Sequence, residues 1–135
     1  MKETFKTNID ISNYFGFVYK VTELSSDRIY IGSKQFVSFT VPKGKVNKVK
    51  KESNWRTYRT SNKYLKLMIK KKPLDYKLEI ISLCKDKSIL RYEEAKQIMI
   101  YGALENNNFN GNIKLNVINN YNNYNERVIS YEVLQ

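Results

Sequence analysis

Residues 16–34 read GFVYKVTELSSDRIYIGSK, two apolar runs on either side of the polar segment TELSSD. The first run alternates with a period of two, which places four side chains on one face of a strand: Phe15, Phe17, Tyr19 and Val21. Two strand-like runs joined by a segment rich in Ser and Asp predict an antiparallel β-hairpin.

The rest of the chain predicts a mixture of strands, helices and loops. The expected elements, in order, are a short strand at 35–41, an exposed lysine-rich loop at 43–53, a helix at 62–72 capped by Ser61 and ended by Pro73, a buried strand at 76–84, and a helix from its cap Ser88 to about Leu104. Leu65, Met68 and Ile69 mark the buried side of the first helix. Leu90, Ala95, Ile98 and Met99 mark that of the second.

The tail has an unusual composition, because eleven of the twenty residues from 106 to 125 are asparagine. Asparagine favours turns, so we expect a loop-rich tail with short strands at 116–118 and 128–133. The size and composition predict one domain at residues 1–112, with a basic insertion at about 35–60, and an Asn-rich extension at 113–135.

The composition excludes several kinds of chemistry. The chain has no histidine and a single cysteine, Cys84, so His-dependent nucleophiles, zinc sites and a disulfide framework are excluded. A bound metal would have oxygen ligands, which favours Mg²⁺ or Mn²⁺. There is no apolar run of membrane-spanning length and no secretory signal, so we expect a cytoplasmic protein that does not interact with membranes.

Positive charge is concentrated in one segment. Residues 43–72 contain twelve Lys and Arg residues against one acid, Glu52, and so carry the whole net charge of +11. Such a concentration predicts a surface that binds a polyanion and favours nucleic acid as that polyanion. A solubilising surface is the alternative.

Two tripeptides, FVY at 17–19 and YIG at 30–32, lie ten residues apart on the predicted hairpin. Together with the order strand, strand, basic segment, helix, strand, helix, they resemble the GIY-YIG nuclease superfamily over about residues 16–112. The resemblance implies an α/β (α+β) fold in which helices flank a small central antiparallel β-sheet.

The resemblance also implies site residues. Tyr19 and Tyr30 match the two tyrosines whose hydroxyls line the family's active site, and Lys34 lies near the position where many members have a lysine. The alternative for both tyrosines is ordinary packing in a sheet. The family's phosphate-binding arginine matches Arg56 or, as a second choice, Arg59, since a guanidinium can bind two phosphate oxygens.

Glu94 matches the family's metal-binding glutamate. It shares an i, i+4 row with Leu90 and Ile98, so its carboxylate is expected at the edge of the apolar side of the second helix, while Glu93 is expected to face solvent. An ion pair with Lys or Arg is the alternative role for Glu94. Asn110 matches an asparagine that we interpret as structural.

These expectations combine into a metal-dependent DNA endonuclease of phage or mobile-element type. Mg²⁺ or Mn²⁺ would bind Glu94, double-stranded DNA would be the substrate, and basic residues would contact its backbone: Lys43, Lys45, Lys48, Lys50, Lys51, Arg59 and Lys63. Two alternatives stay open: an inactive relative that only binds nucleic acid, and a basic phage factor that binds an acidic host protein.

Overall fold

A computed structural model describes residue 5 and residues 10–111 and 121–131. Its elements in chain order are the 3-10 turn η1 (Ile11–Asn13), strands β1 (Gly16–Glu23), β2 (Ile29–Gln35), β3 (Val37–Thr40) and β4 (Val49–Glu52), helix α1 (Lys63–Lys71), the 3-10 turn η2 (Pro73–Asp75), strand β5 (Tyr76–Cys84), helix α2 (Lys87–Ile100), the short helix α3 (Tyr124–Arg127) and strand β6 (Val128–Ser130).

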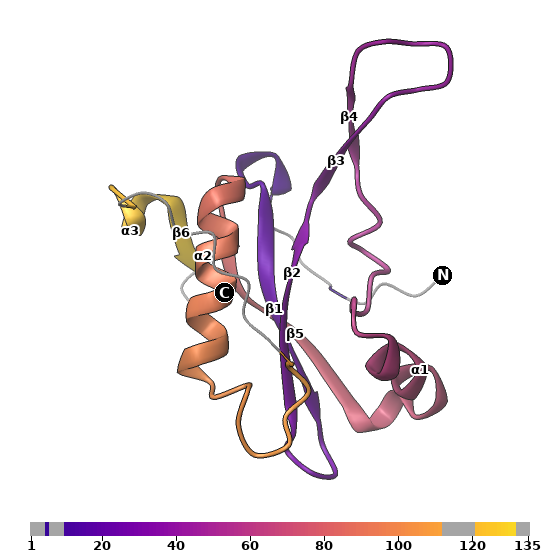
Figure 1. Cartoon of the computed structure of the whole chain (residues 1–135), viewed down its shortest axis with the longest axis vertical. Helices are drawn as coiled ribbons and strands as arrows, with labels where there is room; N and C mark the ends of the chain where they lie inside the picture. Colours follow the sequence, from indigo (N-terminus) through magenta and orange to yellow (C-terminus); the bar gives the residue numbers. More distant parts are fainter. Residues whose placement is uncertain (1–4, 6–9, 112–120, 132–135) are drawn as a thin grey trace.

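The centre of the fold is a four-stranded antiparallel sheet with the strand order β2-β1-β5-β6. Helix α2 lies along one side of it and α1 on the other (Figure 1). β3 and β4 pair only with each other among the described strands, as a two-stranded ribbon that projects from the domain. The predicted α+β class, a small antiparallel sheet flanked by helices, is confirmed.

The central strand β1 is buried on both faces, which explains its apolar composition. Phe17, Tyr19 and Val21 pack with Trp55 and with α1, as the alternation predicts. On the opposite face Val18 packs with Ile31, Cys84 and the buried side of α2. Phe15 packs on this second face, contrary to the prediction, because it precedes β1 and is not held in the strand's alternation.

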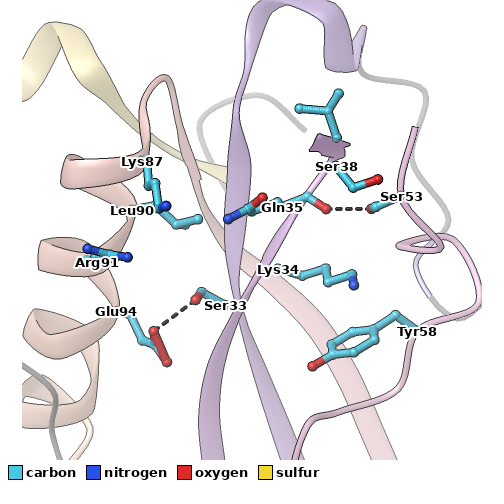
Figure 2. A pocket seen from close by; sticks show the side chains of 11 residues that line it. Ser33, Lys34, Gln35, Ser38, Ser53, Tyr58, Lys87, Leu90, Arg91 and Glu94 are labelled. Atoms are coloured by element: carbon cyan, nitrogen blue, oxygen red, sulfur yellow. Dashed lines mark hydrogen bonds between the residues drawn. The ribbon is translucent and has the colours of Figure 1, made fainter. Parts of the chain in front are cut away.

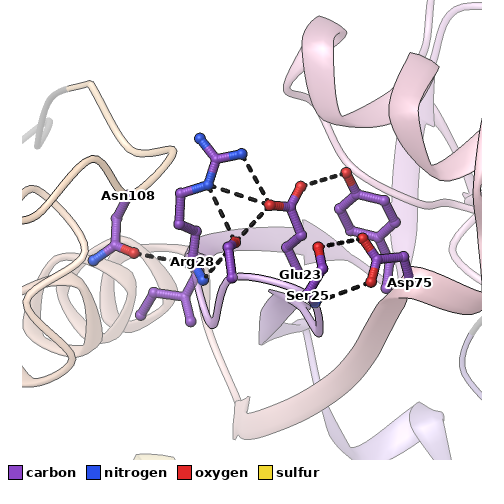
Figure 3. Close-up of polar contacts among 8 residues, drawn as sticks. Glu23, Ser25, Arg28, Asp75 and Asn108 are labelled. Atoms are coloured by element: carbon purple, nitrogen blue, oxygen red, sulfur yellow. Dashed lines mark hydrogen bonds and ion pairs between the residues drawn. The ribbon is translucent and has the colours of Figure 1, made fainter.

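The turn between β1 and β2 is held by a buried carboxylate (Figure 3). Glu23, which is 6% exposed, accepts hydrogen bonds from Ser26 (2.5 Å), Arg28 (2.9 Å) and the hydroxyl of Tyr76 (2.6 Å). The hydrogen bonds of Ser26 and Tyr76 outweigh the effect of burial and lower the pKa of Glu23 to about 2. Asp27 takes a positive φ of 60° at the tip of the turn.

Both helix caps differ from the prediction by one or two residues. Asn62, not Ser61, caps α1, since its side chain accepts a hydrogen bond from the Leu65 N–H. Asp86, not Ser88, caps α2 in the same way. Asn and Asp satisfy free N–H groups at a helix start as well as Ser does, so composition alone does not choose between neighbouring polar residues.

Other boundaries also shift. Helix α2 ends at Ile100 instead of Leu104, and Met99 is 57% exposed, outside its buried side. The predicted loop at 43–53 contains β4, whose four residues are all exposed and stay in the ladder through their pairing with β3. The predicted strand at 128–133 forms in part, as β6, which ends at Ser130. The predicted strand at 116–118 lies outside the described residues.

Among the residues that the structure describes, the helices are too short or too polar to span a membrane.

Candidate active site

The candidate site lies at the free edge of the sheet, on β2. Two segments cover this edge at different points. The side chain of Asn110 accepts from the N–H of Ile31 and donates to its carbonyl, both at 2.8 Å, and the Ser53 hydroxyl donates to the Gln35 carbonyl at 2.6 Å. Ser33 lies between these two points, and two adjoining pockets open there. The structural role predicted for Asn110 is therefore confirmed.

Glu94 borders both pockets. Its Oε2 accepts a hydrogen bond of 2.8 Å from the hydroxyl of Ser33, which joins α2 to the edge strand (Figure 2). The carboxylate is half-buried, at the margin of the apolar side of the helix where its spacing from Leu90 and Ile98 placed it. Ser33 occupies the position after the glycine, and the sequence assigned it no role.

The two tyrosines have different environments. Tyr30 is half-buried, borders the pocket beside Glu94, and shares a hydrogen bond of 3.1 Å with the Ser61 hydroxyl. Burial raises its pKa, and the charge of Glu94 adds to that increase. Tyr19 is fully buried, and its hydroxyl donates to Oγ1 of Thr60 at 3.3 Å. Burial likewise raises the pKa of Tyr19, so both phenols are protonated near neutral pH.

Lys34 approaches the same site from the other face of β2. Its ammonium lies 4.4 Å from the ring centre of Tyr58, and both residues border the pocket with Glu94 (Figure 2). Burial lowers the pKa of Lys34. The side chains of Ser33 and Lys34 point to opposite faces of the sheet. Both line the pocket because it lies at the edge of the sheet, where the two faces meet.

The arginines are arranged differently from the expectation. Arg56 stacks on the ring of Trp55 at 4.4 Å and pairs with Glu52 at 3.2 Å, and neither it nor Arg59 borders the two pockets beside Glu94. Arg91 borders both of them from α2. Sequence reasoning missed Arg91, although its position three residues before Glu94 puts it on the same side of the helix.

Glu93 is buried, contrary to its predicted exposure. It is 2% exposed, and Tyr124 of α3 donates a hydrogen bond of 2.6 Å to its Oε1. Residues that follow the predicted domain therefore cover this part of α2. The helical spacing located Glu94 correctly, but it could not show that a distant segment would pack over Glu93.

The predicted nucleic-acid-binding residues fall into two groups. Arg59 and Lys63 are exposed near the start of α1. The others are exposed on β4 and on the loop between β3 and β4: Lys43, Lys45, Lys48, Lys50 and Lys51. None of these residues lines the pockets beside Glu94, so any contact with DNA would be made away from the reacting phosphate.

The donors at the pockets fit a hard divalent cation. The described residues contain no cluster of three or more His, Cys, Asp and Glu side chains. Glu94 is the carboxylate that borders both pockets, with the hydroxyls of Ser33 and Tyr30 nearby. Magnesium is commonly held by one or two carboxylates and completes its coordination with water and substrate phosphate, so such a sparse oxygen set suits it.

Comparison with known proteins decides the family. The sequence model described as "Putative endonuclease segE, GIY-YIG domain" matches residues 1–124. The chain belongs to this GIY-YIG family. No curated protein and no solved structure gave a match. The GIY-YIG assignment from the hairpin is thus confirmed, and the family is one of endonuclease domains.

Proposed function

We propose that this GIY-YIG protein is a metal-dependent endonuclease that hydrolyses phosphodiester bonds in double-stranded DNA. The observation that carries the proposal is the position of Glu94 at two pockets that are also bordered by Arg91, with Lys34 and Tyr30 on either side. A carboxylate, cationic side chains and a phenol around two adjoining pockets are groups that can support phosphodiester hydrolysis.

Glu94 would hold Mg²⁺ or Mn²⁺ through its carboxylate, supported by the hydrogen bond from Ser33. The cation would supply Lewis-acid polarisation of the phosphate. Arg91 and Lys34 would bind the phosphate oxygens and offset the charge that develops as the bond breaks. Arg56, which packs on Trp55, would then contribute to the shape of the neighbouring segment more than to phosphate binding.

Tyr30 would orient the attacking water. Its raised pKa keeps the phenol protonated, so it would act as a relay: it would accept the proton of the water and pass its own proton to the Ser61 hydroxyl, and exposed Ser61 would release its proton to solvent. Tyr19 is enclosed in the core and would support Tyr30 from behind, since their ring centres lie 6.3 Å apart.

Supercoiled plasmid provides the direct test. The purified protein should nick or linearise it with magnesium or manganese and leave it intact with a chelator. A protein that binds DNA under both conditions and never cuts it would be an inactive member of the family. A protein that neither cuts nor binds DNA at low salt would contradict the proposal and favour an acidic protein partner.

A further inference from the structure

The ribbon of β3 and β4 stands apart from the sheet (Figure 1). Its ladder pairs Val37 with Glu52 at the base and Thr40 with Val49 at the outer end. Isolated two-stranded hairpins are at best marginally stable in water, and this one has little of the domain against its outer part. The exposed outer part of the ribbon is therefore available for contact with a binding partner.

Its surface combines exposed apolar groups with positive charge. Four apolar residues are about half or more exposed: Phe39 (51%), Val41 (51%), Val46 (92%) and Val49 (49%). Directly opposite residues share a face of a ladder, so Phe39 and Lys50 project together, as do Ser38 and Lys51. Apolar side chains interleaved with lysines indicate a contact surface for a polyanion that also offers apolar groups.

The charge has no counterpart within the ribbon. Residues 37–51 contain five lysines and no acid. The acid at its base, Glu52, is occupied by the indole N–H of Trp55 at 2.9 Å and by Arg56. None of the five lysines forms an ion pair in the described part of the chain. Phosphate groups would supply the missing negative charge.

We propose that this ribbon enters the major groove of double-stranded DNA. The groove is about 12 Å wide and admits a two-stranded ribbon, whereas the minor groove, about 6 Å wide, has to be widened by deforming the DNA before it can take one. The lysines contact the phosphates on both rims, and Phe39 and Val46 face the base edges, where the methyl group of thymine is the apolar feature. This inference takes one point from the proposed function, namely that the polyanion is double-stranded DNA.

The position of the ribbon links groove binding to the candidate site. Val37 and Ser38 at its start and Ser53 at its end border the same pocket as Lys34 and Glu94. At about 3.3 Å per residue, the three steps of β3 from Val37 to Thr40 span roughly 10 Å, close to the width of the groove, and the loop that follows β3 extends the ribbon further (Figure 1). A ribbon inserted in this way holds one rim of the groove, and therefore one DNA strand, at the pocket.

Dimethyl sulfate footprinting in a chelator tests the proposal without any cleavage. The reagent methylates guanine N7 in the major groove and adenine N3 in the minor groove. We expect protection of guanine N7 and an unchanged reaction at adenine N3. Protection of adenine N3 alone, or preferential binding of single strands or RNA, would overturn the proposal.

Variants separate the two kinds of contact. Lys48→Gln/Lys50→Gln/Lys51→Gln should reduce the slope of log K against log salt by about 2.7, as expected for three phosphate contacts. Phe39→Ser/Val46→Ser should keep that slope.

Wild type should bind a duplex containing uracil in place of thymine at least threefold more weakly than the thymine duplex, and the Phe39/Val46 variant should bind both equally. Equal binding by wild type, with no protection of guanine N7, would contradict the ribbon's placement.

Lys66→Gln/Lys70→Gln/Lys71→Gln on α1 is the matched control, since it removes the same charge away from the ribbon. It should leave the protection of guanine N7 in place. Thermal unfolding of each variant checks the fold.

The proposed groove binding and the proposed cleavage can be contradicted separately. A protein that protects guanine N7 but never cuts contradicts only the proposed nuclease activity. One that cuts plasmid with no major-groove protection contradicts only the ribbon's role.

Discussion

The ring of Tyr19 lies across the backbone of Gly32, its register partner on the neighbouring strand. A Cβ at position 32 would overlap the hydroxyl end of Tyr19 and come within 2.9 Å of the ring of Tyr30. The YIG glycine is thus required by packing between the two tyrosines. The group that approaches Gly32 most closely is a side chain of the same domain.

Gly32→Ala should therefore destabilise the protein by about 3 kcal/mol, because the added methyl group meets rigid aromatic atoms. Combining it with Tyr19→Val should cost less than the sum of the two single changes. Urea unfolding measures both effects. Gly111→Ala is the control, since a Cβ there meets nothing within 4 Å, and its effect should stay within about 0.5 kcal/mol. Additive costs would contradict the overlap.

Glu94→Gln should abolish cleavage with magnesium or manganese and preserve DNA binding. The amide keeps the shape of the side chain and can still accept from Ser33, but it removes the charge that a hard cation requires. Plasmid nicking and salt-dependent binding measure the two properties. Glu105→Gln, at an exposed position after α2, should cut normally.

Glu93→Gln, which its predicted exposure would have made the natural control, is unsuitable because Glu93 is buried against Tyr124. Cleavage at the wild-type rate by Glu94→Gln would exclude Glu94 as the metal ligand. A large fall in its melting temperature would instead favour a structural ion pair.

Tyr30→Phe should slow cleavage by roughly 10²-fold, because it removes the hydroxyl that borders the pocket and bonds to Ser61. Tyr19→Phe removes a buried hydrogen bond to Thr60 and should cost about 1 kcal/mol of stability with little change in rate. Single-turnover cleavage and urea unfolding distinguish the two effects. The opposite ranking would move the relay to Tyr19.

Arg91→Ala should lower the rate of cleavage by about 10²–10³-fold, since it removes a guanidinium that borders both pockets and that offsets developing charge in the proposed mechanism. Arg91→Lys should restore part of the rate, because an ammonium keeps the charge but cannot bind two oxygens. Arg56→Ala is the comparison, and its main effect should be a lower melting temperature from loss of its packing on Trp55. A large rate loss in Arg56→Ala with a normal rate in Arg91→Ala would support the original assignment.

Stability should fall in acid partly through Glu23. Its folded pKa of about 2 lies below the ordinary value near 4.3, so its contribution is complete above about pH 4.3 and is lost as the pH falls toward 2. Glu23→Gln should destabilise the protein by about 2–3 kcal/mol at pH 6 and less at pH 3. Urea unfolding at both pH values tests this. An equal loss at both would mean that the carboxylate is not held ionised.

Local patterns in the chain were sufficient for the hairpin, for both helices and for the position of Glu94 at the edge of the apolar side of α2. Alternation specifies which strand residues share a face, and helical spacing specifies which residues share a side, because both follow from backbone geometry within one element. The family assignment rested on these same local features. The predicted caps and the predicted loop at β4 were wrong, since Asn, Asp and Ser compete as caps and a lysine-rich segment can still pair through its backbone.

Tertiary packing alone decided which residues meet at the edge of β2. Ser33, Arg91 and Tyr58 join Glu94 because α2 and the segment after β4 approach that edge from opposite faces, a contact between parts of the chain that no spacing encodes. The burial of Glu93 depends on Tyr124, thirty-one residues away. Patterns within one element determine its own faces, whereas a site shared by several elements exists only when they pack together.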